Sequence, residues 1–403
     1  MAIADVAEYA HLTPEEVEAI GRELDLIRAE IEASRGAADA LYIRRVIRAQ
    51  RWMAAGARIG MIAAAPMDKR ARRPVMAASA ITLGLAKILE NMEIGHNVMH
   101  GQWDWMNDPE IHSSTWEWDT AQPAEQWKHS HNYIHHQFTN VLGFDNDIGY
   151  GVLRMAREQK WTPANLGQPV YNALLAGLFQ WGVALHDLDL EAIRKGKKDP
   201  AEMKRQLRQI AAKGRNQFLK DYVLYPALTG PRWKETIKAN ATANLMRNVW
   251  AYLIIFCGHF PDGALHFTEE ELEDETRAEW YLRQIYATAN FEGGPLLHLM
   301  SGNLGYQIEH HVFPDLPSNR YAEISGRIRA LCEKYDIPYT SGPLHRQYGQ
   351  VLRTVMKLSL PNRFTTDDKP ETFDHPEVSH GRRDHEKRQS RRTELGAWSR
   401  TAS

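Results

Sequence analysis

Clustered histidines constrain this chain more than any other feature of its sequence. Of the 18 histidines in 403 residues, eight gather in three short stretches, GHNVMHGQ, HSHNYIHHQF and GYQIEHHVFP. Imidazole binds zinc, copper, iron and nickel, and a buried polar ring without a partner is costly. The fold must therefore bring these stretches to a place where their ring nitrogens are used, and a metal site is the first expectation.

The first stretch holds His96 and His100, four residues apart. On an α-helix this spacing places both rings on one face, one turn apart, where they can grip one metal ion. A lone pair of this kind is more often incidental than ligating, so it decides little alone. Glu93 lies three residues before His96 and is expected to accept an imidazole N–H, the alternative being a pair with Lys87 or with solvent.

The second stretch holds four histidines. His131 and His135 repeat the step of four, and His136 stands next to His135, which lets one helix turn ligands toward two neighbouring metal ions. His129 lies seven residues before His136, on the same face, so the spacing does not exclude it as a ligand. The choice among these rings stays open on spacing alone.

The third stretch adds the adjacent pair His310 and His311, with Gln307 three residues before His310. A single histidine, His259 in FCGHFPDG, ends the last apolar segment of the chain, just as His96 ends an earlier one. Both segments would deliver a histidine to the same face of a helical bundle.

The number of histidines exceeds the needs of one metal ion. Catalytic zinc takes three protein ligands plus water, whereas eight histidines imply two ions. The chain has two cysteines, Cys257 and Cys332, which excludes a disulfide scaffold, a cysteine-rich zinc module and an iron–sulfur cluster, and neither cysteine has a nucleophile-like setting. A dinuclear, imidazole-rich redox site beside apolar helices points to iron and dioxygen, which oxidise an unactivated methylene where acid–base chemistry does not.

Membrane embedding is a weaker signal. No stretch offers about 18 clean apolar residues, and the mean hydropathy is −0.51. Four segments are nevertheless locally apolar: 52–67, 75–94, 161–185 and 218–260. We expect membrane-embedded helices whose polar residues face inward, and the alternative is a soluble helical protein.

Positive charges indicate how these segments are arranged across the membrane, because Lys and Arg collect on the cytoplasmic side. The stretch 194–220 carries ten of them and is expected as a cytosolic loop, so that 161–185 lies along the interface or re-enters. The first two apolar segments then form one hairpin, and 218–228 with 241–260 forms a second. The MDKRARR turn of the first hairpin opposes this topology, since it places four Lys or Arg on the outer side. The predicted fold class is all-α, a membrane-associated bundle with two transmembrane hairpins and a cytosolic helical cap that holds the metal site.

The N-terminal region predicts an amphipathic helix. Its first residues are acidic and lack the basic start of a signal peptide, so they are expected to stay in the cytosol. Thr13 and Glu16 form a capping-box pattern with Pro14 at the first helical position. Apolar residues then recur at spacings of three and four, which predicts a helix of about 20 residues that packs on the body of the protein.

The C-terminal region is different in kind. After Pro361 the sequence is polar and charged with almost no apolar period, which predicts a disordered tail. His375, His380 and His385 lie there with irregular neighbours and are not expected to be site ligands. Over the whole chain 49 basic residues nearly balance 51 acidic ones, so no global field favours a nucleic-acid partner.

The histidine stretches resemble the three histidine boxes of the membrane-bound fatty acid desaturases. The likeness runs from about residue 40 to 362 and is carried by GHNVMHGQWDW, HSHNYIHHQF and GNLGYQIEHHVFPDLPSNR. NDPEIHSSTWEWD, FCGHFPDG and KLSLP make it most similar to the actinobacterial acyl-CoA desaturases of the mycobacterial stearoyl-CoA type. The resemblance implies a di-iron oxidoreductase that uses dioxygen and two electrons to place a cis double bond in a long saturated acyl chain, near C9.

The resemblance also implies a ligand set. Gln307 stands where some relatives have a further histidine and is a candidate ninth ligand, and Asn303 is a candidate to assist through water. His129 is not a ligand by this match, and His112 has no assigned role. The implied ligands of the two iron ions are His96, His100, His131, His135, His136, His259, His310 and His311.

The same match implies an organisation and a set of partners. Residues 48–362 form the desaturase domain, between an N-terminal amphipathic helical region, 1–47, and the disordered tail, 363–403. We expect an integral cell-membrane protein, surrounded by membrane lipids, with its active site on the cytoplasmic side and an acyl-CoA or acyl-lipid substrate.

Electrons must come from elsewhere. The sequence shows neither a Gly-rich dinucleotide loop after a strand nor the His-Pro-Gly-Gly motif of a fused cytochrome b5, so a separate donor protein is expected, ferredoxin-like or a flavin-linked reductase. Two alternatives to the desaturase stay open: a lipid hydroxylase or alkane monooxygenase with the same boxes, and a non-catalytic histidine-rich metal-binding membrane protein.

Overall fold

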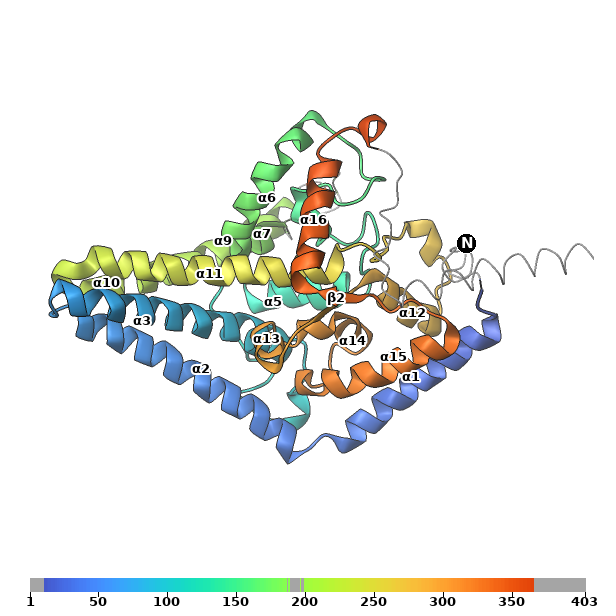
Figure 1. The fold of residues 1–403 in the computed structure, drawn as a ribbon, viewed down its shortest axis with the longest axis horizontal. Coiled ribbons are helices and arrows are strands. Elements are labelled where there is room, and N and C mark those ends of the chain that lie inside the picture. Colours follow the sequence, from blue (N-terminus) through green and yellow to red (C-terminus); the bar gives the residue numbers. More distant parts are fainter. Residues whose placement is uncertain (1–10, 187, 189–195, 197–198, 366–403) are drawn as a thin grey trace, which may run out of the picture.

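The computed structural model describes residues 11–186, 188, 196 and 199–365, and this part of the chain is almost entirely helical (Figure 1). The predicted all-α class is confirmed. The helical elements, with π and 3₁₀ segments labelled η, are α1 (Pro14–Ser34), α2 (Ala37–Ala64), α3 (Lys69–Leu89), η2 (Glu90–His96), α4 (Asn97–Met99), η3 (Asp104–Met106), α5 (Ala124–Trp127), η4 (Lys128–His135), η5 (Gly149–Gly151), η6 (Pro163–Gly167), α6 (Gln168–Gly177), α7 (Phe179–His186), α9 (Pro200–Phe218), η7 (Leu219–Leu224), α10 (Tyr225–Leu228), η8 (Gly230–Arg232), α11 (Trp233–His259), η9 (Glu269–Leu272), α12 (Arg277–Ala287), α13 (Pro295–Met300), η10 (Leu304–Tyr306), α14 (Gln307–Val312), η11 (Ser318–Arg320), α15 (Tyr321–Tyr335), α16 (Leu344–Leu358) and η12 (Asn362–Phe364).

Two short strands complete the described part. β1 (Asn290–Glu292) and β2 (Ser341–Pro343) pair in parallel, with Asn290 opposite Ser341 and Glu292 opposite Pro343. Each strand is three residues long, so the pair joins two loops and does not form a sheet that organises the fold. It places the chain just before α13 beside the start of α16.

α1 begins as the sequence predicts. The Thr13 hydroxyl accepts a hydrogen bond from the Glu16 N–H at 3.2 Å, and the Glu16 carboxylate accepts one from the Thr13 N–H at 2.8 Å. This reciprocal capping box satisfies two N–H groups that a helix start leaves unpaired. The helix runs for 21 residues, close to the predicted length.

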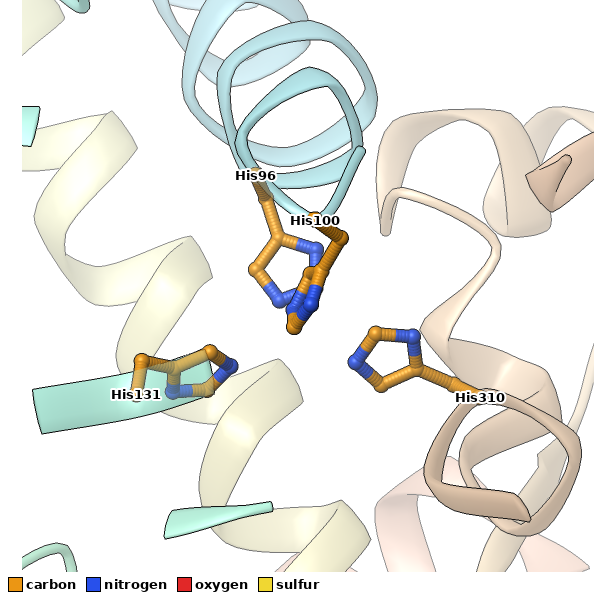
Figure 2. Close-up of side chains that lie close together, drawn as sticks. All are labelled: His96, His100, His131 and His310. Carbon is orange, nitrogen blue, oxygen red and sulfur yellow. The ribbon is translucent and has the colours of Figure 1, made fainter. Parts of the chain in front are cut away.

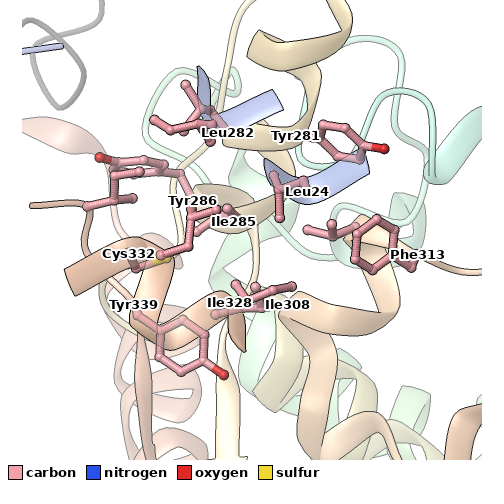
Figure 3. Packing of buried hydrophobic residues seen from close by; sticks show 14 of the residues in the cluster. Leu24, Tyr281, Leu282, Ile285, Tyr286, Ile308, Phe313, Ile328, Cys332 and Tyr339 are labelled. Carbon is pink, nitrogen blue, oxygen red and sulfur yellow. The ribbon is translucent and has the colours of Figure 1, made fainter. Parts of the chain in front are cut away.

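The apolar stripe of α1 packs on the body of the protein, as expected. Leu24 is fully buried against α12 and α15, where it joins Tyr281, Leu282 and Ile328 in one core (Figure 3). Each fully buried side chain of this size stabilises the fold by about 1.5–3 kcal/mol. This core also contains Ile308 and Phe313, so it fixes the helix that carries the third histidine stretch.

Three long helices form an arm of the molecule. α2 and α3 pair as a hairpin, and α11 runs along α3 (Figure 1). Small residues let the backbones approach. A Cβ atom on Gly84 of α3 would lie 2.8 Å from the Met246 sulfur of α11, and one on Gly60 of α2 would lie 2.5 Å from the Ser79 hydroxyl. Close contact through small residues is the packing that helices use in membranes.

Polar side chains of this arm point inward. Asp221 of η7 is fully buried and accepts hydrogen bonds from Arg58 at 2.6 Å, from Lys87 at 3.1 Å and from Asn244 of α11 at 3.2 Å. A buried charge is costly unless it is paired and hydrogen-bonded, and here each charge has partners. The residues that lower the mean hydropathy therefore bond to one another inside the arm.

One continuous helical run in the described residues, Lys69–Met99, is long and apolar enough to cross a membrane. The buried core helix of a soluble protein meets the same criterion of length and composition. The first predicted hairpin corresponds to α2 and α3, and the second to α11 with the short segment η7 and α10 before it. Their embedding in a bilayer stays a prediction.

Two other predicted segments take definite shapes. The apolar segment 161–185 forms η6, α6 and α7, of which the longest, α6, has ten residues and cannot span a bilayer. The basic stretch 194–220 is not a loop in its described part, because Asp199 caps a helix with Pro200 at its first position, and α9 follows. The predicted tail, 363–403, lies outside the described residues from 366 on, as do His375, His380 and His385.

Candidate metal centre

Two π-helical segments present the first two histidine stretches. α3 passes into η2, which ends at His96, and η4 contains His131 and His135. In a π-helix each N–H bonds to the carbonyl five residues back, and such segments are frequent at functional sites. The spacing argument assumes ordinary α-helices, and we find no signal in the sequence that marks these turns as π.

The remaining stretches come from helix ends. His259 is the last residue of α11, and His310 and His311 lie in the last turn of α14. All three are buried. α11 and the run from α3 to α4 thus end at the same place, and each delivers a histidine there, as the sequence predicts.

One group of histidines contains His96, His100, His131 and His310 (Figure 2). One ring nitrogen from each lies within 4.8 Å of one from every other, and the rings point toward a common centre. Their closest ring centroids, those of His96 and His100, are 4.6 Å apart. Four imidazoles from the α3–α4 run, η4 and α14 therefore face one point.

A second group contains His135, His259 and His311, with ring nitrogens again within 4.8 Å of one another. His136 lies between the groups, because its ring centroid is 4.6 Å from that of His100 and 4.3 Å from that of His311. The structure thus brings together all eight histidines that the resemblance implies, in two adjacent clusters.

The free nitrogens of these rings are what a metal requires. In the described residues the buried ring nitrogens of this cluster that lack a hydrogen-bond partner are Nε2 of His100, His131, His135, His310 and His311, Nδ1 of His259, and both nitrogens of His136. Leaving one buried donor or acceptor unsatisfied costs about 1–3 kcal/mol. These eight atoms belong to seven rings of the two clusters, and such a set of buried, unpartnered nitrogens fits the binding of metal.

The opposite nitrogens of several rings are held by the protein. His135 Nδ1 lies 3.0 Å from both oxygens of Asp145, and His131 Nδ1 lies 3.5 Å from Asp147. Such partners fix the orientation of a ring and raise its basicity as a ligand. Neutral groups hold the others: the Asn97 amide oxygen at 3.1 Å from His96, the Tyr321 hydroxyl at 3.2 Å from His310, and the Gln284 amide oxygen and the Thr139 hydroxyl, each at 3.2 Å from His311.

Sequence reasoning missed this supporting layer. Asp145 and Asp147 lie after His135 in the sequence, in the turn FDND. Two acidic residues so soon after a histidine stretch are the sequence signal that could have identified them. Gln284 and Tyr321 lie on α12 and α15, distant in the sequence, and nothing in the sequence pairs them with histidines. Their role depends on how the helices pack.

The protonation of the rings suits ligation. Burial lowers the pKa of His131 to about 4 and holds the pKa values of His136 and His310 well below the ordinary range of imidazole. A neutral ring is the state that binds a metal. For His135 burial lowers the pKa, but the charges of Asp145 and Asp147 outweigh it and raise the pKa to about 8.

One expectation near the first stretch is wrong. Glu93 does not accept an imidazole N–H, and it pairs with neither Lys87 nor solvent, because it is fully buried and accepts hydrogen bonds from Tyr42, Asn303 and the Ser318 hydroxyl at 2.7–2.9 Å. The reason is the π turn, in which a residue three positions before His96 no longer shares its face. Asn303 donates its side-chain amide to Glu93 at 2.9 Å, and its assistance through water stays a prediction.

The other predicted residues fall into place around the clusters. Gln307 is buried, its side-chain nitrogen lies 2.9 Å from His259 Nε2, and its side-chain oxygen has no partner in the described residues. His129 is exposed and stacks loosely on Tyr133, with ring centroids 5.9 Å apart, outside both groups. His112 bonds to the Ser114 hydroxyl at 2.8 Å and is also outside them.

A narrow cavity of about 50 Å³ reaches the first group. His96 and His131 form part of its wall, and so do Trp118 and Trp127. Much of the remaining wall is apolar and comes from η2, α7 and α11, including Met92, Phe179, Val183, Ala251 and Ile255. A small apolar group can therefore approach one metal position.

The two cysteines take no part in this site. Both are buried and free, as the sequence analysis expects, and Cys332 lies in the core beside α1. Burial raises the pKa of the Cys332 thiol well above its ordinary value. It is therefore a packed, unreactive side chain.

Comparison with known proteins agrees with the geometry. The sequence model of the family described as fatty acid desaturase matches residues 73–343. The chain is 52% identical over 379 residues to the NADPH-dependent stearoyl-CoA 9-desaturase of two strains of Mycobacterium tuberculosis, and the match covers 92% of this chain and 87% of the relative. It is 26% identical over 282 residues to the sn-1 linoleoyl-lipid 6-desaturase of a Synechocystis strain, covering 67% of this chain and 76% of that protein. The chain therefore belongs to the fatty acid desaturase family, and it is an oxidoreductase.

Proposed function

We propose that this desaturase holds two iron ions and uses them, with dioxygen, to introduce a cis double bond into a long-chain acyl-CoA near C9. The observation that carries the proposal is the pair of histidine clusters, in each of which ring nitrogens lie within 4.8 Å of one another and include buried, unpartnered atoms. Iron, when bound, supplies the redox chemistry that activates dioxygen and removes hydrogen from two adjacent methylene carbons. An all-imidazole set suits iron, and acid–base groups cannot perform this reaction.

The proposed ligands divide between the ions. His96, His100, His131 and His310 would hold one ion, and His135, His259 and His311 the other, with His136 completing the set. Gln307 is a further candidate, because its unpartnered side-chain oxygen lies beside His259. Asp145 and Asp147 keep two of the rings in position.

The protein's own contribution is orientation. An acyl chain that widened the small cavity beside His96 and His131 would lie there in few conformations, with Trp118 and Trp127 in the wall beside the histidines. Fixing the reacting carbons next to the oxidising centre replaces a search in solution by a single geometry. Exclusion of water also protects a strongly oxidising centre from side reactions.

The identity of the substrate is proposed from the relatives. The two mycobacterial proteins act, by name, on stearoyl-CoA at position 9, and they align over 92% of this chain. We therefore propose a saturated acyl-CoA, and desaturation near C9. The same name includes NADPH, whereas the two three-residue strands of the described part form no dinucleotide-binding sheet. A separate electron carrier, ferredoxin-like or flavin-linked, accordingly brings the two electrons.

We also propose that the enzyme is integral to the cell membrane. The arm of α2, α3 and α11 would form the two hairpins together with η7 and α10, with its polar residues turned inward. The histidines lie at one end of this arm, at the ends of α11 and of the α3–α4 run, and in this proposal that end is outside the bilayer, on the cytoplasmic side. Residues 48–362 form the desaturase domain in this proposal.

The test is expression of the full-length protein in a host that lacks this activity, followed by gas chromatography and mass spectrometry of the acyl chains. A new monounsaturated chain is the expected result, lost in His310→Ala and kept in His129→Ala. An alcohol in place of an alkene would identify a hydroxylase. Metal uptake without oxygen consumption or product would identify a metal-binding protein without this activity.

A further inference from the structure

α6 buries two polar side chains beside Leu175 and exposes apolar ones. Gln168 is fully buried and donates hydrogen bonds to the main-chain oxygens of Arg154 at 2.9 Å and Val355 at 3.0 Å. Asn172 is buried and accepts one from the Tyr252 hydroxyl at 2.6 Å. The outer face of α6 exposes Val170 and Leu174, and the same spacing of four continues with Leu166 in η6 and Leu178 just after α6, so that all four side chains are 54–62% exposed. A helix that faces water has the reverse arrangement.

α16 continues this surface. Its inner face buries Val351, Val355 and Leu358 in the core. A second apolar stripe, again with a period of four, lies outside and runs past the end of the helix: Leu352, Met356, Leu360 and Phe364, each 37–63% exposed. Single exposed apolar residues need no explanation, but two regular stripes on neighbouring helices do.

The two helices are locked side by side. The Gln168 bond to Val355 joins α6 to α16, and the Trp161 indole N–H donates to the Ser359 main-chain oxygen at 2.9 Å. Figure 1 shows α16 crossing α11, with α6 beside it, whereas α3 runs along α11 and α2 pairs with α3. If that arm crosses the bilayer, elements that lie across it run along the plane of the membrane.

Positive charges flank the stripes. Lys160 is exposed just before α6, and Arg363 is exposed beside Phe364, with its guanidinium 4.7 Å from that ring. Apolar side chains bordered by Lys and Arg are typical of helices that lie in the interface of anionic membranes. Water, by contrast, would favour polar side chains on this face.

We propose that α6 and α16 form a platform that lies in the lipid interface, with the two stripes in contact with acyl chains and the flanking cations near lipid phosphates. This inference rests on the proposed membrane embedding of the arm, and it adds a second, separate contact with the bilayer. The platform leads directly into α7, whose Phe179 and Val183 line the cavity beside the histidines. Its contact with lipid would therefore fix the depth of that cavity relative to the membrane surface.

The test measures which solvent surrounds each stripe. Full-length protein carrying Leu174→Cys or Met356→Cys is labelled with an environment-sensitive fluorophore, because both native cysteines are buried. It is reconstituted, one copy per nanodisc, in phosphatidylcholine and phosphatidylglycerol. Quenching is compared between nitroxide-labelled lipid and aqueous iodide. Leu26→Cys on α1, 60% exposed, is the control for water, and Ile81→Cys on α3, 52% exposed, is the control for the arm.

We expect nitroxide lipid to quench the labels at Leu174 and Met356 several-fold more than the label at Leu26, and iodide to show the opposite order. Iodide quenching at Leu174 and Met356 equal to that at Leu26 would overturn the platform. The platform would also be overturned if both labels were shielded from both quenchers until residues 366–403 were removed. That result would show that the tail, and not lipid, covers the two stripes. If the label at Ile81 contacts lipid and the label at Leu174 does not, the platform is refuted and the embedding of the arm is not. If neither label contacts lipid, the embedding is refuted as well. The acyl-chain assay tests the desaturase activity separately.

Discussion

Replacement of Asp145 by asparagine tests whether the carboxylate behind His135 governs metal binding. The Asp145 side chain is 1% exposed and accepts from three donors: His135 Nδ1 at 3.0 Å, the Asn140 N–H at 2.8 Å and the Asp147 N–H at 2.9 Å. Asparagine keeps the size of the side chain but offers one oxygen acceptor and an NH₂ group. At least one of the three donors then faces another donor.

This change has two separate effects. Loss of one acceptor in a buried site lowers the free energy of unfolding by about 1–3 kcal/mol. Loss of the charge behind a ligating histidine typically weakens metal binding by about 10–100-fold, which corresponds to about 1.4–2.8 kcal/mol. The first effect belongs to any buried carboxylate with several donors, and the second only to one that holds a ligand.

Asp39→Asn is the matched control. Asp39 is equally buried and accepts from Arg320, Asn319 and the Gly36 N–H, and it bonds to none of the eight histidines. Protein loaded with iron is dialysed against increasing chelator, and retained metal is measured by elemental analysis alongside thermal unfolding of the metal-free forms. Both variants should unfold earlier, and Asp145→Asn alone should lose metal at about 10–100-fold less chelator. Equal metal retention in the two variants would refute the role assigned to Asp145.

The remaining predictions concern the same centre and its partners. Elemental analysis of active protein from iron-replete cells should approach two iron ions per chain, and active protein with a single zinc would contradict the di-iron assignment. His131→Ala should abolish product while His129→Ala keeps it, because only the first ring faces the cluster; equal losses would show that the ligand choice is wrong. The metal-free His135 ring has a pKa raised to about 8, so it holds a proton below that pH, and metal uptake by metal-free protein should increase as pH rises through about 8; titration of metal binding that is flat with pH would contradict this. Neutralising exposed charges of α9, Lys204 and Arg205, should raise the donor concentration needed for half-maximal activity at low salt but not at high salt, where exposed charges are screened; an unchanged donor dependence would remove α9 from the docking surface.

The histidine clusters could be predicted from the sequence because short spacings determine which rings share a helix turn. His259 was reachable as well, since a helix that ends at a bundle face delivers its last residue there. Glu93 could not be placed, because the π turn changes which residues face the metal. Asp145 was also out of reach, since it stands in an irregular turn where no helical period applies.

Local sequence patterns also failed to predict how polar residues are placed in the arm and in the basic stretch 194–220. A hydropathy window averages over a helix and does not separate residues such as Asn244, which bonds to Asp221 inside the arm, from residues that face outward. The charges of 194–220 suggested a loop, yet two of them turn inward, because Lys213 donates to the Trp118 main-chain oxygen at 2.9 Å and Lys220 to Asp119 at 2.6 Å. Long-range partners of this kind are decided by packing, which the local pattern does not contain.

Because of the π turns, the metal site depends on the number of residues in these segments as well as on their identity. An α-helix rotates about 100° per residue, so the loss of one residue that returned η4 to an α-helix would turn everything beyond it by about that angle. A substitution at an exposed position such as Tyr133 leaves the rings where they are. A deletion does not, even when every histidine is kept. A chain one residue shorter between Glu90 and His96 would thus retain the whole motif and lose the site that the motif builds.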